Sequence, residues 1–467
     1  MDDQRTHRGI RLSRQKDVDM TTGNAVLHII RFAFPLLLGN LFQQLYNTVD
    51  TWVVGNYVSN EAFSAVGAVA PIVNMLIGAF MGLSSGAGVV ISQYYGAGRK
   101  DKVEEAVHTA MAMTLILTVL FTALGLFITP YMVGFTNLHQ DAVPEANTYL
   151  TIYFAGMVGL MLYNMGAAIL RAIGDSQRPF YFLVVCAVLN TGLDLLFVLV
   201  FKMGVEGVAL ATILSQAVSA LLVMIVLLRT DSCVKLRIRN LRIHWDILKK
   251  VLLVGIPTAL QMAITAFSNV FVQSYINHFD DGLLSPDYMS GWTAYLKIDQ
   301  LLFLPMQSIS LAITTFVGQN LGKGQLERAN QGVTKAVIIS MSATAILMIP
   351  MLIFAPQIVG FLNNKPEVIA NGTLFLRWLT PFYLLCCFNQ IYAGALRGAG
   401  NSKVSMIIMI ASFVAFRQLY LFCMARICNE IVPIALSYPA GWLLASILTA
   451  IYYHKATLGK TRLLDDV

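Results

Sequence analysis

The chain has 467 residues, of which 57% are apolar and only 12% charged, and its net charge is +7; the mean hydropathy is +0.67. Soluble domains carry about 25% charged residues, so this chain has too few to be a soluble globular enzyme and is too apolar to be disordered. The composition is that of a helical protein that crosses a membrane many times.

Twelve apolar segments are each long enough to cross a bilayer, which takes roughly 20 helical residues. In chain order they cover residues 27–57, 62–93, 104–130, 149–173, 179–201, 206–228, 247–276, 291–317, 333–354, 368–396, 403–425 and 432–453. They predict an all-α polytopic membrane protein. Its expected regions are a basic tail at 1–26, a six-helix lobe at 27–229, a linker loop at 230–246, a second six-helix lobe at 247–454 and a tail at 455–467.

Lysine and arginine collect on one side of these segments. They crowd the tail before the first segment, the loop that holds Arg99 and Lys100, and the linker, whereas the loops at 131–148 and 277–290 contain acidic residues and neither Lys nor Arg. Because cytoplasmic loops carry the excess of positive charge, we expect both termini and the linker in the cytoplasm and the protein in the plasma (inner) membrane. This distribution argues against a nucleic-acid partner. The basic tail and the linker are candidates for contact with anionic membrane lipids, although a solvated loop is the simpler interpretation of each charge run.

An internal repeat divides the chain into two halves. The sequence SQYYGAG at 92–98 recurs as GQNLGKG at 318–324, and LRAIGDS at 170–176 recurs at the same offset as LRGAGNS at 396–402. Each half holds six segments, so both enter the membrane in the same sense and should be related by a pseudo-twofold axis along the membrane normal. Two joined bundles with a cleft between them suit alternating access and predict a functional monomer.

Only three acidic residues lie inside the predicted segments and away from their ends: Asp50, Asp194 and Asp299. A charge at this depth is costly and therefore indicates function. Asn190 lies one turn from Asp194, and Thr212 on the next segment is at the same depth as Asp50. Two carboxyl groups so placed should not both ionise easily, so we expect these four residues to take up a proton or, as an oxygen cage, a sodium ion. For Thr212 alone, a helix-packing hydrogen bond is the simpler interpretation.

Other polar side chains inside the segments are candidates for the substrate cavity. Gln43 and Asn47 extend the polar face of Asp50 on the first segment, and Asn164 lies on the fourth. Gln261 and Thr265 form a weaker polar stripe on the seventh segment and are expected to line the cleft.

The second half lacks the carboxyl pair, because Val272 and Tyr420 stand where the repeat would place Asp50 and Asp194. We expect Asp299 to form a structural ion pair there, with Arg417 or Lys297.

The cysteines show no metal-binding spacing, and no catalytic motif is present, so neither an enzyme nor a resident metal or other cofactor is expected.

Several stretches resemble one known family, the multidrug and toxic compound extrusion (MATE) transporters. They are Val49-Asp50-Thr51, QYYGAG at 93–98, LRAIGD at 170–175, and Asn190-x3-Asp194 followed by GVEGVALAT at 204–212. Within that family the chain is similar to the DinF-like branch. Another branch relies on acidic residues in the seventh and tenth helices, and this sequence has none there.

The resemblance implies twelve helices in two lobes and export of drug-like, often cationic compounds in exchange for protons or sodium. Acids of the N-terminal lobe carry the coupling in this branch. Asp50, Asn190, Asp194 and Thr212 match its ion-site positions, and Gln43 and Asn164 match polar residues of its cavity. The first helix of the branch bends near a proline, which is Pro35 here.

Two functions therefore remain open. The first is a secondary active multidrug antiporter driven by protons or sodium. The alternative is a flippase for a lipid-linked substrate, for which Arg377 and Arg417 could supply a cationic cleft. The acidic N-terminal half favours cationic cargo and hence the antiporter.

Overall fold

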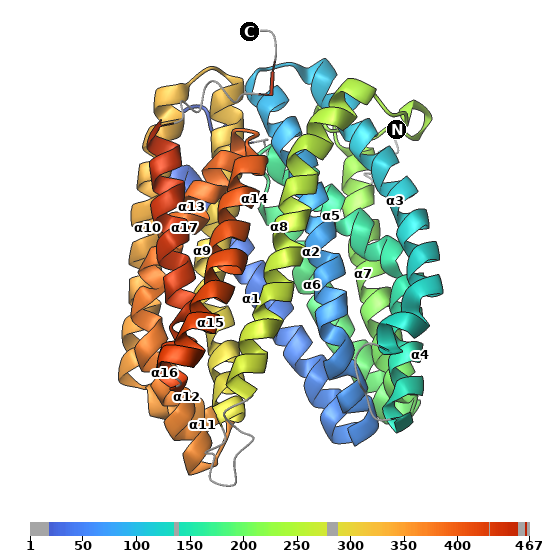
Figure 1. The fold of residues 1–467 in the computed structure, drawn as a ribbon. Helices are drawn as coiled ribbons and strands as arrows, with labels where there is room; N and C mark the ends of the chain where they lie inside the picture. The colour runs from blue at the N-terminus through green and yellow to red at the C-terminus, as the bar shows by residue number, and fades with distance from the viewer. Residues whose placement is uncertain (1–17, 135–139, 278–287, 429, 456–462, 465–467) are drawn as a thin grey trace, which may run out of the picture.

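The computed structural model describes residues 18–134, 140–277, 288–428, 430–455 and 463–464. Two helical bundles stand side by side, and the start of α1 and the end of α17 lie at the same end of the molecule (Figure 1). We call this end the terminal end. The bundle of the first half is named the N-lobe and that of the second half the C-lobe.

In the described part of the first half, the N-lobe contains seven α-helices. They are α1 (Ala25–Tyr57), α2 (Asn60–Gly96), α3 (Lys100–Gly134), α4 (Val143–Ala155), α5 (Met157–Ala172), α6 (Gln177–Leu195) and α7 (Gly204–Arg229). Side chains cap the first two, since Asn24 accepts a hydrogen bond from the Val26 amide and Ser59 accepts one from the Ala62 amide. A π-helical turn, η2 (Leu196–Val200), follows α6, and a short 3-10 turn, η1 (Gln140–Ala142), precedes α4.

The C-lobe repeats this arrangement with more breaks. Its helices are α8 (Trp245–Asn277), α9 (Tyr288–Gly322), α10 (Leu326–Ile353), α11 (Ala355–Leu362), α12 (Pro366–Leu379), α13 (Tyr383–Gly398), α14 (Ser402–Ile410), α15 (Arg417–Ile427), α16 (Ile431–Ala435) and α17 (Ser437–Lys455). Short turns η5 (Thr380–Phe382) and η6 (Ala411–Phe416) connect α12 to α13 and α14 to α15.

Within the described residues, 11 helical stretches are long and apolar enough to cross a membrane, and the bent pair α4–α5 supplies the twelfth. The prediction of twelve spans in two six-helix bundles is therefore confirmed. The bend between α4 and α5 is 48° and falls at Gly156. A Cβ there would come within 2.4 Å of Ile213 on α7, so the close packing of these helices requires glycine at this position.

Helices α1 and α8 each pass from one lobe to the other through the middle of the molecule (Figure 1). The first turns of α1, including Ile29 and Phe32, pack in an apolar cluster with α9, whereas Val53 near its end packs with α6 and α7. Conversely, Val251 near the start of α8 packs in the main N-lobe core, and Val272 packs in the C-lobe. The first half of α8, which the sequence analysis groups with the second lobe, therefore packs against the N-lobe, and its second half packs in the C-lobe.

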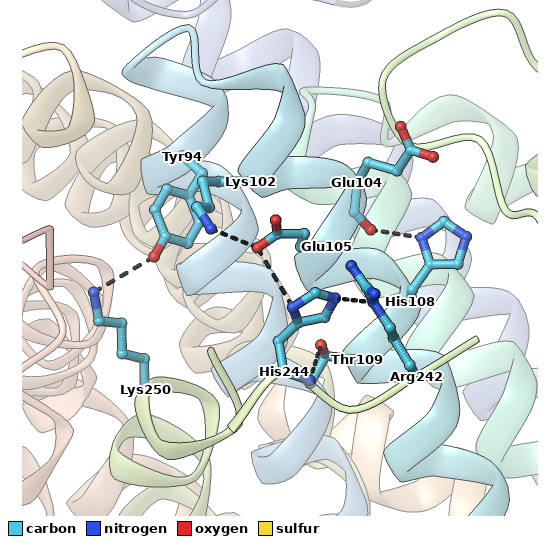
Figure 2. Close-up of polar contacts among 9 residues, drawn as sticks. All are labelled: Tyr94, Lys102, Glu104, Glu105, His108, Thr109, Arg242, His244 and Lys250. Carbon is cyan, nitrogen blue, oxygen red and sulfur yellow. Dashed lines mark hydrogen bonds and ion pairs between the residues drawn. The ribbon is translucent and has the colours of Figure 1, made fainter. Parts of the chain in front are cut away.

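The linker between the lobes is docked on the N-lobe. The Arg237 amide donates to Nε2 of His108 at 3.0 Å, and the His244 amide donates to Oγ1 of Thr109 at 3.1 Å. Figure 2 shows the second of these contacts, together with the contact between Nδ1 of His244 and a carboxyl oxygen of Glu105 at 3.6 Å. Since α3 holds the linker, the start of α8 is fixed to the N-lobe.

Candidate functional site

A pair of acidic side chains occupies the N-lobe interior. Asp50 comes from α1 and Asp194 from the last turn of α6, and their carboxyl groups lie within hydrogen-bonding reach of each other. Asp194 is fully buried, and Asp50 is half-buried. Directly after Asp194 the helix widens into the π-helical turn η2, an irregularity that often marks a functional position.

The described residues provide no hydrogen-bond donor to the buried oxygens of the pair. Among the described residues, neither oxygen of Asp194 nor Oδ1 of Asp50 accepts a hydrogen bond from another group, and the amide of fully buried Asn190 is also without a partner. Two carboxylates can share a hydrogen bond only if one carries a proton. Ionising both would leave two negative charges in a low-dielectric interior, so a proton or a bound cation stabilises this arrangement.

Two tyrosines next to the pair were not anticipated from the sequence. Tyr46 lies one turn before Asp50 on α1 and is buried, and Tyr149 on α4 is close enough to both acids for their charges to act on its hydroxyl. Tyr149 stacks on Tyr153 with ring centroids 6.3 Å apart. The spacing of Tyr46 from Asp50 was the available signal for one of them, but Tyr149 gives no sequence signal, since aromatic residues are frequent in every segment.

Thr212 and Asn164 bond to the backbone of their own helices. The Thr212 hydroxyl donates to the Val208 carbonyl at 3.0 Å, and Nδ2 of Asn164 donates to the Leu160 carbonyl at 2.8 Å. Within the described part of the chain Thr212 makes no hydrogen bond to either acid. Its hydroxyl oxygen can still accept a bond or contact a cation, because a donated proton leaves its lone pairs available.

The other predicted cavity residues are divided between α1 and α8. Gln43 is half-buried and Asn47 exposed on α1, while Gln261 and Thr265 are half-buried on α8. Gln261 accepts a long hydrogen bond of 3.5 Å from Ser405 on α14. These side chains thus lie on the two helices that cross between the lobes.

Pro35 lies inside α1, near the end of the part that packs in the apolar cluster of the C-lobe; farther along the helix, the polar contacts of Asn40 and Gln44 also reach α9. Proline removes one hydrogen bond from a helix interior and allows it to bend. Its position between the two packing regions of α1 is where a movement of one lobe against the other would bend the helix.

The buried charge of the C-lobe has the opposite sign. Arg417, 3% exposed, donates from Nη2 to Ser268 at 2.7 Å and to Asn269 at 2.9 Å, and its guanidinium lies 4.8 Å from the ring centre of Tyr438. No ion pair joins Asp299 to Arg417 or to the exposed Lys297 in the regions the structure describes. Asp299 instead accepts a 3.5 Å hydrogen bond from Tyr295, so in this structure the expected ion pair is replaced by neutral partners.

A family model, MatE, matches the chain twice, at residues 35–196 and 257–418. The two matches cover most of both halves and begin at Pro35 and Pro257, which agrees with the internal repeat. "Probable multidrug resistance protein YpnP" of Bacillus subtilis (strain 168) is 28% identical over 405 residues, covering 86% of this chain and 89% of the relative.

A second relative is named for the transport of a cofactor and not for drug resistance. The "FAD transporter" of Shewanella oneidensis is 24% identical over 443 residues, covering 91% of this chain and 93% of the relative. Among solved structures, the "outward-facing conformation of a multidrug resistance MATE family transporter of the MOP superfamily" superposes with a TM-score of 0.88 at 24% identity, covering 94% of this chain and 97% of that one.

Proposed function

This chain belongs to the MatE family of membrane transporters, and we propose that it is a secondary active antiporter that exports lipophilic, drug-like compounds in exchange for protons or sodium ions. As a member of this family it is a transporter and not an enzyme. The observation that carries the ion coupling is the buried pair of Asp50 and Asp194, whose oxygens have no donor among the described residues.

The chemistry of the pair defines the ion-coupling step. With the pair unloaded and ionised, its negative charge favours a cationic substrate in the N-lobe. When a proton or sodium ion enters among Asp50, Asp194, Asn190 and Thr212, that charge is neutralised and the substrate is no longer held. Competition between ion and substrate for one charge is enough to couple an ion gradient to export.

Alternating access requires the lobes to separate at one end at a time. In this structure hydrogen bonds join the lobes at the terminal end and as far as Gln44 to Gln300, 2.6 Å apart, at mid-helix. Beyond Gln44, no hydrogen bond links α1 to the C-lobe within the described ranges. This supports a state closed at the terminal end, and we propose Pro35 as the point where α1 bends during the change.

The basic loops lie at the terminal end, and by the positive-inside rule this supports a cytoplasmic location for that end. Export would then release substrate at the opposite end. We propose a functional monomer in the plasma (inner) membrane, because both repeats needed for the cleft are present in one chain.

The test is efflux of a fluorescent lipophilic cation from proteoliposomes, with a pH gradient and a sodium gradient imposed separately. We expect one of the two gradients to drive efflux, and both Asp50→Asn and Asp194→Asn to abolish that drive. Asp299→Asn is the matched control, since it makes the same change at an intramembrane acid of the other lobe and should leave the drive intact.

Gradient-driven efflux that survives in both N-lobe variants would contradict the proposal. Wild-type protein that is monodisperse but shows no efflux under either gradient would favour the lipid flippase. In that case co-purified lipid and scrambling of a labelled lipid would be the next measurements.

A further inference from the structure

The seam between the lobes at the terminal end is built around two glutamines from the repeated motif. Gln93 lies in the last turn of α2 in the N-lobe, Gln319 lies in the last turn of α9 in the C-lobe, and both side chains are fully buried. The helices touch backbone to backbone here. A Cβ added at Gly96 or at Gly322 would collide with the main chain of the glutamine across the seam.

Each glutamine caps a helix of the opposite lobe. Nε2 of Gln93 donates to the carbonyl of Gly398 at the end of α13, and Nε2 of Gln319 donates to the carbonyl of Ala172 at the end of α5, both at 2.9 Å. Carbonyls at a helix C-terminus have no partner within the helix, so these bonds satisfy groups that would otherwise need water. They also break if the lobes part at this end.

The carbonyl oxygen of each glutamine binds one end of the chain. Oε1 of Gln319 accepts from the Met20 amide at 3.0 Å, and Oε1 of Gln93 accepts from the Leu463 amide at 3.1 Å. Each amide thus donates to one backbone group and accepts from another, and its orientation is fixed because its nitrogen faces a backbone acceptor and its oxygen a backbone donor. The two ends of the chain thus occupy matching places in the pseudo-twofold arrangement.

The N-terminal segment, residues 18–22, bridges the seam. Met20 is buried in a C-lobe cluster, and Arg328 donates to its carbonyl at 3.1 Å. On the other side, the Val18 amide donates to the Ile173 carbonyl at 3.2 Å, and the Val18 carbonyl lies so close to Gly174 (φ +88°) that a Cβ there would meet it at 2.3 Å. The repeated glycine of LRAIGDS is therefore needed where this segment crosses.

A local turn shapes the N-terminal segment. Asp19 accepts from the amide and the hydroxyl of Thr21, at 2.8 and 2.5 Å, and Lys323 of the C-lobe donates to that hydroxyl at 2.8 Å. Partial burial acts to raise the pKa of Asp19, but the bonds from Thr21 and the charge of Lys323 outweigh it and lower the pKa. The carboxylate that holds the turn therefore stays ionised at neutral pH.

The C-terminal segment, residues 463–464, makes the complementary crossing. Leu463 and Leu464 are buried in the core cluster of the N-lobe, although they follow the last helix of the C-lobe. On its C-lobe side, Leu463 fills the space beside Gly400 (φ +89°), where a Cβ would come within 2.5 Å of it. Each end of the chain is thus packed into the lobe of the other half.

We propose that residues 18–22 and 463–464 are two latches that hold the lobes together at the terminal end, with Gln93 and Gln319 as positioning residues, and that both latches release when this end opens. The proposal rests on the alternation of the lobes but not on the identity of the coupling ion or the cargo. In this proposal the two motif glutamines stabilise the state that is closed at the terminal end, and residues 18–22 and 463–464 take part in transport by docking and releasing.

The test measures the separation of the lobes directly, in the absence of any gradient. Spin labels are placed at Lys100→Cys and Lys403→Cys, two exposed positions at the terminal ends of α3 and α14, after replacement of the six native cysteines. We expect the parent protein to show one short distance between the two spin labels. In Gln93→Met or Gln319→Met, which keep side-chain length but lose two hydrogen bonds, the ratio of open to closed molecules should rise about tenfold, and a second, longer distance should emerge.

Two further variants complete the design. Leu463→Asp undocks the C-terminal segment without altering either glutamine and should raise the same longer population. Gln331→Met makes the same substitution on the exposed face of α10 and should leave the distance distribution unchanged.

The latches are ruled out if Gln93→Met, Gln319→Met and Leu463→Asp all retain the parental distance distribution. A lower melting temperature with unmoved distances would likewise overturn the proposal, since it would show a merely structural role. Because no ion gradient or cargo is used, this result is independent of whether Asp50 and Asp194 couple transport.

Discussion

The two lobes share a fold but carry opposite charges at equivalent depth. In the N-lobe, Asp50 and Asp194 lie within hydrogen-bonding reach of each other. The described residues donate no hydrogen bond to their buried oxygens, so the two acids can bond to each other only if one of them is protonated. In the C-lobe the repeat replaces these acids with Val272 and Tyr420, and the guanidinium of Arg417 donates instead to polar groups of α8. Carboxylates without donors depend on an external cation, whereas the C-lobe contains a cation as part of the chain.

This difference explains how a symmetric architecture can have a single ion-sensitive half. Arg417 connects α15 to α8 through Ser268 and Asn269, and to α17 through Tyr438. The corresponding N-lobe helices, α6, α1 and α7, are those that supply Asp194, Asp50 and Thr212. We therefore expect these three N-lobe helices to shift with ion loading and their C-lobe counterparts to stay fixed.

The strongest test of this contrast removes the built-in cation. Arg417→Met loses two short charge-assisted hydrogen bonds and the contact with Tyr438, and should lower the free energy of unfolding by about 2 kcal/mol or more. Arg417→Lys should recover part of this loss, since an ammonium keeps the charge but not the planar fork. Thermal unfolding of the purified protein measures both.

The control for Arg417 is Arg426→Met, which alters an exposed arginine of the same helix. We expect little change in its melting temperature. If Arg417→Met kept full stability but changed the ion dependence of efflux, the C-lobe would take part in coupling and the contrast between the lobes would fail.

A smaller effect is expected from the buried amides, and it should differ between the lobes. Asn190 in the N-lobe and Asn389 in the C-lobe are both fully buried, with no hydrogen-bond partner for either side-chain amide atom in the described chain. Replacing either by Leu removes no hydrogen bond, so the stability of the protein should be unchanged or slightly higher. Only Asn190→Leu should weaken the apparent affinity for the coupling ion, by about tenfold for a lost ligand.

Ion titration of efflux and thermal unfolding, measured on the same preparations, separate the two asparagines. Equal loss of ion affinity in Asn389→Leu would show that the amides act through packing and not as ligands. A large loss of stability in Asn190→Leu would mean that this amide has a structural partner when the protein is in the membrane.

Most of the fold could be predicted from hydropathy and the repeat, because a bilayer requires long apolar helices whatever their neighbours are. The passage of α1 and α8 from one lobe to the other could not. An apolar pattern shows that Ile29 and Val53 are buried, but it does not show that they are buried in different lobes. The bend at Gly156 was also missed, since its cause is the distant side chain of Ile213.

The candidate site shows the same limit. Depth along a helix follows from residue counting, and it correctly suggested that Asp50 and Asp194 lie close together. The direction of a side chain around the helix axis is less certain in a segment that is apolar on every face. For this reason Arg417 was expected beside Asp299, but it contacts Ser268 and Asn269 on α8.

The smallest effects should come from replacing the prolines of α1 and α8, the two helices that pass between the lobes. Comparing the two replacements tests which lobe moves. Pro35 in α1 and Pro257 in α8 lie at equivalent positions, each between the part of its helix packed on one lobe and the part packed on the other. Changing either to Ala restores a helix hydrogen bond, so the protein should be as stable as the parent or more so, while bending becomes harder. If only the N-lobe helices respond to the ion, Pro35→Ala should slow gradient-driven efflux several-fold and Pro257→Ala much less, as initial rates in proteoliposomes would show. Equal slowing by both would mean that the two lobes bend together despite their opposite charges.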